Sequence, residues 1–409
     1  MFEPQDHPND FRYPGGPPVA PYDAAGWTLA YLMGVEFDRL TDEFDGPFQR
    51  IPYGEQQSPK GQATKVAAGY VLSSAANNSF LVVNELLKAG AGVFRMKEGT
   101  PGFAAGSFFV PASAKAKGVI EKSVADFGIE AGTVSKKPAG LKPVNSLRIA
   151  LWDTYGGSMP SGWMRFIFEQ YHFNADVIYP PTVDSGSLRS KYDVIVFVGG
   201  AIPGVGSEGG RGFGGGGFGG GQQNDSIPAE FKGRRGRITV DKSIPELKRF
   251  LEAGGRIVTI GSSTSLAYHL QLPVRNALVE MNNGEEQRLP AEKYYIPGSV
   301  LQVRLDSTQQ ATYGLPTDCD VYFDASPVFN LAPEAVAKGS IKPLLWFPNN
   351  KPLRSGWAWG QSYLQGGVTA FEATVGTGKL YAFGPEITFR AQTHGTFKLL
   401  FNQLLSTAE

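Results

Sequence analysis

The sequence has 409 residues, enough for two or three domains, and its 42% hydrophobic content supports packed cores and excludes a disordered chain. Lys plus Arg and Asp plus Glu both number 38, so the formal net charge is zero and no global field favours nucleic acid or an anionic membrane as a partner. The single cysteine, Cys319, excludes an internal disulfide, and no apolar run approaches the roughly 20 residues of a membrane span.

Residues 1–64 are rich in proline and glycine, and they contain one apolar island around Trp27, Leu29 and Tyr31. This composition favours an extended strap that packs on a neighbour through its aromatic side chains. The island has little sequence of its own to cover it. We therefore expect a further domain to cover it, and removal of residues 1–60 to improve solubility.

Residues 65–137 alternate short apolar runs with two helical patterns, which predicts a small α/β module. One helix should begin at Asn77 or Asn78 and stop at Gly90, and the other should span 115–127. Residues 138–145 contain two prolines and a glycine, a composition typical of a linker.

Residues 146–409 contain almost continuous apolar runs, such as 192–198, of the kind found in strands buried on both faces of a parallel sheet. Helical patterns separate these runs, although 280–375 contains short β runs with turns. We predict an α/β domain with a doubly wound, mostly parallel sheet and flavodoxin-like layering. The glycine-rich stretch 204–225 lacks the Gly-Lys-Ser/Thr ending of a phosphate loop, and we predict a disordered loop there.

The stretch 254–270 passes from an apolar strand through a corner of small residues into a short helix. This is the shape of a nucleophile elbow, with Ser263 at the corner. The alternative, which is the more frequent in such folds, is a plain strand-to-helix connection in which Ser262 or Ser263 caps the helix.

A catalytic elbow would need an oxyanion hole and a base. The backbone amides of Gly199 or Gly200, after a neighbouring strand, are the candidate oxyanion donors. His269 and His394 are the candidate bases. His269 should lie roughly 9 Å along the helix that follows the corner, so His394 is the better candidate.

Two resemblances follow from these strings. The pair Gly199-Gly200, the elbow at 261–265 and a late strand ending at Gly384 resemble the class I glutamine amidotransferase-like fold. Other strings look like the C-terminal region of large bacterial zinc carboxypeptidases of the carboxypeptidase A type; they are 21–29, Ile149-Ala150-Leu151-Trp152, Gly162-Trp163-Met164-Arg165-Phe166 and 389–402. The second resemblance implies a parent protein that hydrolyses peptides with zinc, a covalently linked or upstream peptidase domain, and a periplasmic or secreted location.

The sequence departs from both families at the residues that carry chemistry. None of the histidines, His7, His172, His269 and His394, is followed three residues later by glutamate, so the zinc motif is missing and we expect no metal or cofactor in this chain. The elbow has Ser263 where an amidotransferase needs a cysteine thiolate. Gly384-Pro385-Glu386 offers no histidine where the base should be.

We therefore expect a non-catalytic C-terminal accessory region of a zinc metallocarboxypeptidase-like protein. One alternative is a hydrolase that depends on Ser263. Another is a peptide- or carbohydrate-binding module that uses Trp346, Trp357 and Trp359, although aromatic packing over a sheet edge explains this group more simply.

Overall fold

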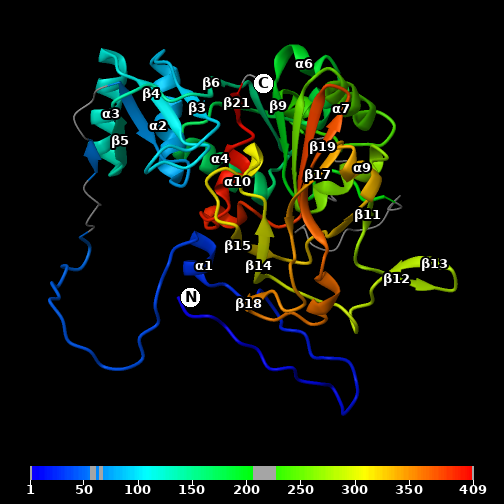
Figure 1. The fold of residues 1–409 in the computed structure, drawn as a ribbon. Coiled ribbons are helices and arrows are strands. Elements are labelled where there is room, and N and C mark those ends of the chain that lie inside the picture. Colours follow the sequence, from blue (N-terminus) through cyan, green and yellow to red (C-terminus); the bar gives the residue numbers. More distant parts are fainter. Residues whose placement is uncertain (1, 56–60, 64–67, 206–226, 408–409) are drawn as a thin grey trace. The chain divides into compact units, whose positions relative to one another are not determined.

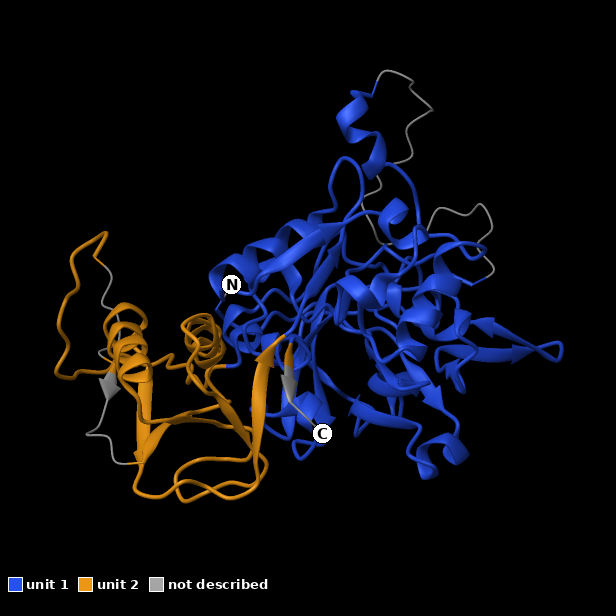
Figure 2. Ribbon diagram, turned by 90° about the horizontal axis from the view of Figure 1, so that it is seen from above, with its two compact units in different colours: residues 1–34, 147–404 blue, residues 35–146, 405–409 orange. Residues whose placement is uncertain are grey.

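The computed structural model describes residues 2–55, 61–63, 68–205 and 227–407, so the glycine-rich stretch predicted at 204–225 lies outside the described residues from 206 onward. The chain forms two compact units (Figure 2). Unit 1 contains residues 1–34 and 147–404, and unit 2 contains residues 35–146 and 405–409. None of the helices in the described part of the chain is long and apolar enough to cross a membrane.

Unit 2 is built on a 7-stranded sheet. Its strands, in spatial order, are β1 (Gln62–Ala63), β5 (Glu130–Val134), β2 (Gly69–Leu72), β4 (Phe108–Pro111), β3 (Phe94–Met96), β6 (Leu141–Ser146) and β21 (Leu405–Thr407). Helices α2 (Asn77–Lys88) and α3 (Ala114–Phe127) lie close to their predicted positions and pack on each other. The chain order of β2, α2, β3, β4, α3 and β5, with antiparallel neighbours, is the split βαβ arrangement.

The linker predicted at 138–145 is mostly strand β6, which pairs antiparallel with β3 and with β21. Val144 explains the difference, because its side chain is buried and its amide donates to the Val93 carbonyl at 2.9 Å. The last strand of the chain therefore belongs to unit 2 and not to the predicted domain 146–409.

Unit 1 contains a 12-stranded sheet within the described residues (Figure 1). Its main path runs β15 (Asp318–Phe323), β14 (Ser299–Leu305), β17 (Ile341–Trp346), β19 (Val368–Val375), β20 (Gly378–Phe383), β10 (Arg256–Ile260), β9 (Val194–Phe197), β7 (Ile149–Trp152) and β8 (Ala175–Ile178). Strands β11 (Val274–Asn276), β16 (Phe329–Leu331) and β18 (Leu353–Ser355) pair beside this path, and β12 (Val279–Asn282) and β13 (Glu285–Arg288) form a separate hairpin.

The sheet of unit 1 is mixed, so the predicted mostly parallel sheet is not what forms. From β20 through β10, β9 and β7 to β8 every neighbouring pair is parallel. From β15 to β20 every neighbouring pair is antiparallel. The physical reason lies in the connections: β19 and β20 are joined by a tight turn, whereas a parallel pair needs a long crossover.

Helices surround these strands, and their bounds are α4 (Met159–Gln170), α5 (Pro180–Asp184), α6 (Leu188–Lys191), α7 (Ser243–Glu252), α8 (Leu266–His269), α9 (Pro333–Ala337) and α10 (Phe397–Phe401). Helix α7 shows why they form there, since Leu247, Phe250 and Leu251 lie on one face, and all three are buried. That face packs against β10, β19 and β20.

The N-terminal strap is divided, because residues 1–34 belong to the core of unit 1 whereas 35–64 belong to unit 2. Helix α1 (Leu29–Met33) places Leu32 in a buried cluster with Val300 and Tyr322. Thr28 is fully buried, and its hydroxyl lies 2.7 Å from the Ser355 hydroxyl. Unit 1 therefore covers Leu32 and Thr28 itself, and the covering of this island by a further domain stays a prediction.

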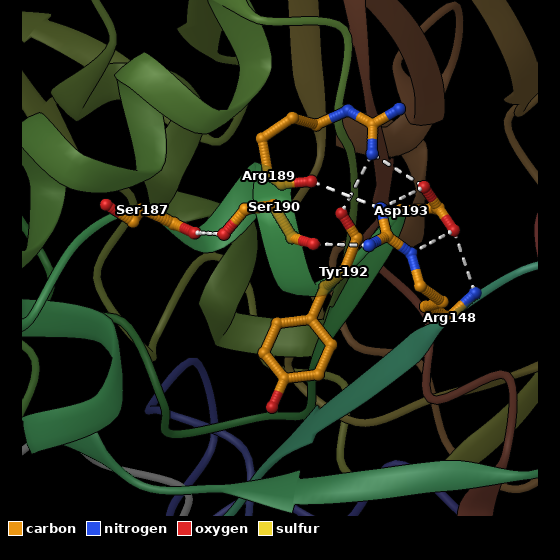
Figure 3. A network of polar contacts seen from close by, with 6 residues as sticks. All are labelled: Arg148, Ser187, Arg189, Ser190, Tyr192 and Asp193. Carbon is orange, nitrogen blue, oxygen red and sulfur yellow. Dashed lines mark hydrogen bonds and ion pairs between the residues drawn. The ribbon is translucent and has the colours of Figure 1, made fainter.

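An ionic network holds the amino ends of the parallel strands together (Figure 3). Asp193, just before β9, accepts hydrogen bonds from the Arg148 amide at 2.9 Å, from the Arg148 guanidinium at 2.8 and 3.0 Å, and from Arg189 at 2.6 Å. The Arg148 side chain also donates to the backbone carbonyls of Arg189 and Ser190. These bonds, led by those from Arg148, hold the pKa of Asp193 far below its usual range.

Candidate functional site

The opposite, carboxyl ends of the parallel strands bring three chain segments together. Gly199 follows β9, Gly261 follows β10, and Glu386 follows β20 by three residues. A Cβ atom built on Gly199 would lie 3.2 Å from Glu386 Oε1, and one built on Gly261 would lie 2.3 Å from the same oxygen. The Glu386 carboxyl therefore lies directly over both glycines.

The corner residue of the elbow is Gly261 and not Ser263, which corrects the sequence prediction. The predicted order of strand, turn and helix is present as β10, the 3₁₀ turn η2 (Gly261–Ser265) and α8. Gly261 has φ 58°, the left-handed conformation that a nucleophile elbow imposes on its corner residue. Glycine is favoured there for two reasons, the positive φ and the Glu386 oxygen that fills the space of a side chain.

Ser263 lies two residues beyond the corner, in the interior, and its side chain is 0% exposed. Its hydroxyl donates to the Val198 carbonyl at 2.5 Å and accepts from the amides of Ala201 and Ile202 at 3.0 and 3.2 Å. The hydroxyl proton is thus held by a carbonyl, and no imidazole receives it. This geometry makes Ser263 a link between the η2 turn and the loop that follows β9.

The predicted oxyanion donors lie beside the elbow, as expected from neighbouring parallel strands. The Gly200 amide, however, donates to the Ser262 hydroxyl at 2.8 Å, so it is already used. The hydroxyls of the exposed Ser262 and the buried Ser263 both accept hydrogen bonds from backbone amides of the loop that follows β9. The arrangement joins two segments of backbone and uses the Gly200 amide for that purpose.

The histidines lie in four separate surroundings. His269 Nε2 is 2.8 Å from the Pro203 carbonyl, and His7 Nε2 is 2.9 Å from the Ala25 carbonyl. His394 lies in the turn before α10, with its ring 4.7 Å from that of Phe397, and burial lowers the pKa of its imidazole. His172 ends the turn after α4 with φ 57°.

Glu386 is the residue that sequence reasoning missed as a candidate. Its carboxyl is half-buried, forms no hydrogen bond or ion pair with the rest of the described chain, and has its pKa raised to about 7 by burial and by the charge of Asp324. A carboxyl with a pKa near neutrality can hold or release a proton at physiological pH. In the sequence, Glu386 could have been recognised as a candidate because it lies three residues after a buried strand, at the place where a histidine base was expected.

A cavity of about 220 Å³ lies next to this carboxyl edge. Its walls come from the strap (Tyr22 to Ala24), from the loop before β14 (including Gly298), from the end of β15 (Tyr322 and Asp324) and from the 3₁₀ turn η5 (Phe389–Ala391). Tyr322 stacks on Phe389 with ring centroids 3.9 Å apart. We call this the acidic-aromatic cavity.

The tryptophans proposed as a binding platform are used for packing. Trp357 is buried and donates from its indole to Asn9 at 2.8 Å, and Trp359 stacks on it with centroids 6.3 Å apart. Phe11 contacts Trp359 edge-on. Trp346 lies in β17 opposite Arg304 of β14, whereas Trp357 bonds to Ser299 at the other end of that strand, so packing explains the group.

Zinc, which the carboxypeptidase resemblance implies for a parent protein, does not fit the residues described here. In residues 2–55, 61–63, 68–205 and 227–407 no group of three or more His, Cys, Asp or Glu side chains could hold a metal ion. Cys319 is buried, which raises the pKa of its thiol to about 12. We therefore derive no chemistry through a metal for this chain.

Comparison with protein-family models and with curated proteins found no match. Among solved structures, a β-galactosidase from Bacillus circulans sp. alkalophilus is 12% identical with a TM-score of 0.33, and the match covers 64% of this chain but only 32% of that one. A putative ThuA-like protein from Bacteroides uniformis is 10% identical, with a TM-score of 0.32 and coverage of 63% and 89%. A glutamine amidotransferase from Thermotoga maritima is 12% identical, with a TM-score of 0.30 and coverage of 58% and 75%.

Proposed function

We propose that the chain is a non-catalytic accessory region built on an amidotransferase-like domain, and that its parent is a zinc metallocarboxypeptidase-like protein. One observation carries the non-catalytic part of this proposal. The strained corner of the elbow holds Gly261, which has no side chain, and the Glu386 oxygen fills the space that a nucleophile would need.

Two further features support the proposal. The parallel strands follow the spatial order β8, β7, β9, β10 and β20, which is the order 2-1-3-4-5 of flavodoxin-like sheets. The buried hydroxyl two residues beyond the corner, that of Ser263, donates its proton to a backbone carbonyl. A serine needs a base within hydrogen-bond reach to become a nucleophile, so this hydroxyl stays protonated.

The test is an activity panel on the purified full chain with glutamine, a simple ester and C-terminal peptide substrates. We expect no turnover from the wild type or from Ser263→Ala. Ser263→Ala should instead lower the free energy of unfolding by about 3 kcal/mol, since it leaves buried amides and a carbonyl unpaired. The control Ser262→Ala, at an exposed hydroxyl, should cost about 1 kcal/mol or less. Ester turnover that disappears in Ser263→Ala would establish the hydrolase alternative.

The carboxypeptidase parentage is a separate part of the proposal, and it rests on the sequence strings given above. The nucleotide sequence upstream of the codon for Met1 tests it directly. An in-frame region encoding His-x-x-Glu with a distant second histidine would support a zinc peptidase parent. A stop codon close upstream would count heavily against it.

A further inference from the structure

The acidic-aromatic cavity contains negative charge that the protein does not neutralise. Asp23 and Asp324 line it, and the Glu386 carboxyl, whose pKa is raised to about 7, interacts with Asp324 from the adjoining edge. Burial, followed by the charge of Asp23, raises the pKa of Asp324. None of the three carboxylates forms an ion pair with a described Lys, Arg or His side chain.

The cavity also presents a polar group that has no hydrogen-bond partner among the described residues. Tyr322 is only 1% exposed, and its hydroxyl forms no hydrogen bond with the described residues. The hydroxyl lies under the backbone of Gly298, where a Cβ atom would be 2.1 Å from it, and both residues line the cavity. Burial raises the pKa of Tyr322, so the hydroxyl stays neutral and can accept a hydrogen bond from a ligand. The hydroxyl oxygen is not fully enclosed, so a ligand in the cavity can reach it.

The one cationic side chain at the cavity, Arg390, is directed to aromatic rings and not to the carboxylates. Its guanidinium lies 4.5 Å from the centroid of Trp27 and 5.1 Å from that of Phe389. The Trp27 indole is itself fixed by a 2.8 Å hydrogen bond to Gln392. Arg390 therefore lines the cavity without forming an ion pair with Asp23 or Asp324.

We propose that the acidic-aromatic cavity binds a small organic cation that carries a primary alkylammonium group. The ammonium would donate to the Asp324 carboxylate and to the Tyr322 hydroxyl, and its alkyl chain would pack on the Phe389 and Tyr295 rings. At about 220 Å³ the cavity is smaller than the sites that hold drug-sized molecules, so the ligand is small. Carboxylates and aromatic faces favour an organic cation over a metal ion, which needs more convergent ligands. This site uses neither Gly261 nor Ser263, so it does not rest on the proposed function.

The test is calorimetric titration of the full chain with n-butylammonium chloride against sodium chloride of equal ionic strength. We expect saturable binding to one site that weakens about tenfold in Asp324→Asn, because a charge-assisted hydrogen bond is lost. The control Asp318→Asn removes the same charge at the other end of β15 and should leave the affinity unchanged. Equal affinity in the two variants would overturn the proposal.

A second variant keeps the test decisive if Asp324→Asn does not fold. Tyr322→Phe retains the ring stacking and removes only the unpaired hydroxyl, so the chain should fold normally and bind n-butylammonium about threefold to tenfold more weakly. Unchanged affinity would contradict the assigned contact. Titrations with methyl α-glucoside and with calcium chloride test a neutral sugar and a metal ion as alternative ligands. Binding of either one, with no binding of n-butylammonium, would refute the organic-cation site.

Discussion

Two carboxylates at opposite ends of the same parallel strands show contrasting surroundings. Asp193, at the amino ends, is surrounded by donors from Arg148 and Arg189, and its pKa is strongly lowered. Glu386, at the carboxyl ends, has no such donor among the residues that the structure describes, and its pKa is raised to about 7. A carboxylate that the protein pairs fully contributes to stability, whereas one that it leaves unpaired costs stability and is available to a ligand or a proton.

The largest effect on this comparison should come from Gly261→Ala. The substitution forces a side chain into φ 58° and places Cβ 2.3 Å from Glu386 Oε1, so we expect a loss of about 2–4 kcal/mol in the free energy of unfolding. Urea denaturation measures it. Gly200→Ala is the matched control, because its φ is 83° but no described atom lies within 4 Å of the added Cβ. If contact with Glu386 causes the loss, Gly261→Ala made in a Glu386→Ala background should lose about as much free energy of unfolding as Gly200→Ala does.

A smaller loss, about 1–3 kcal/mol at pH 7, is expected for Asp193→Asn, since it removes charge-assisted hydrogen bonds that join β7 to β9. The lowered folded-state pKa stabilises the protein above the ordinary pKa of aspartate, and this contribution is lost as the pH falls. The difference between wild type and variant should therefore stay constant from pH 7 to about pH 4 and shrink only as the pH falls below 3.8. Asp318→Asn breaks an exposed pair with Arg304 and should cost at most about 1 kcal/mol. Equal costs for the two variants would contradict the assigned role of the network.

The smallest effect, and one of opposite sign, is expected for Glu386→Gln. The folded-state pKa of about 7 exceeds the ordinary 4.5, so the folded protein holds this proton more tightly and the wild type loses stability as the pH rises from about 4.5 to about 7. Glutamine removes this penalty, and we expect a gain of about 1 kcal/mol at pH 8, an amount reduced for partial exposure. Thermal unfolding at pH 4 and pH 8 measures it. A variant that is less stable than wild type at pH 8 would show that the carboxylate is paired.

Local patterns were sufficient to predict several elements of the fold. The buried runs that form β9 and β10, the helices α2 and α3, and the strand-turn-helix order at 256–269 all follow from hydrophobic periodicity and glycine positions. Strand direction was not predictable in the same way. The short runs between 299 and 375 fit either orientation, and only their pairing partners distinguish an antiparallel arrangement from a parallel one.

The candidate site was less accessible to sequence reasoning, because it depends on distances between remote segments. The elbow could be located from its residues. The sequence did not indicate which of them adopts the left-handed conformation, and that conformation places the corner at Gly261 and not at Ser263. The acidic-aromatic cavity combines the strap with strands and turns about 300 residues further along the chain. No local pattern connects Asp23 with Asp324, so their proximity is a property of the tertiary fold alone.

The strap has a further consequence for biosynthesis. Thr28 bonds to Ser355, a partner 327 positions later in the chain, and a ribosome that adds 5–20 residues per second needs roughly 15–65 s to reach it. Until residues 300–322 are made Leu32 has no surface to pack on, and until Ser355 is made Thr28 lacks its partner, so the growing chain exposes this apolar segment. Ribosome-stalled chains ending before residue 299 should therefore be cut within the strap by a mild protease, whereas released full-length protein should resist.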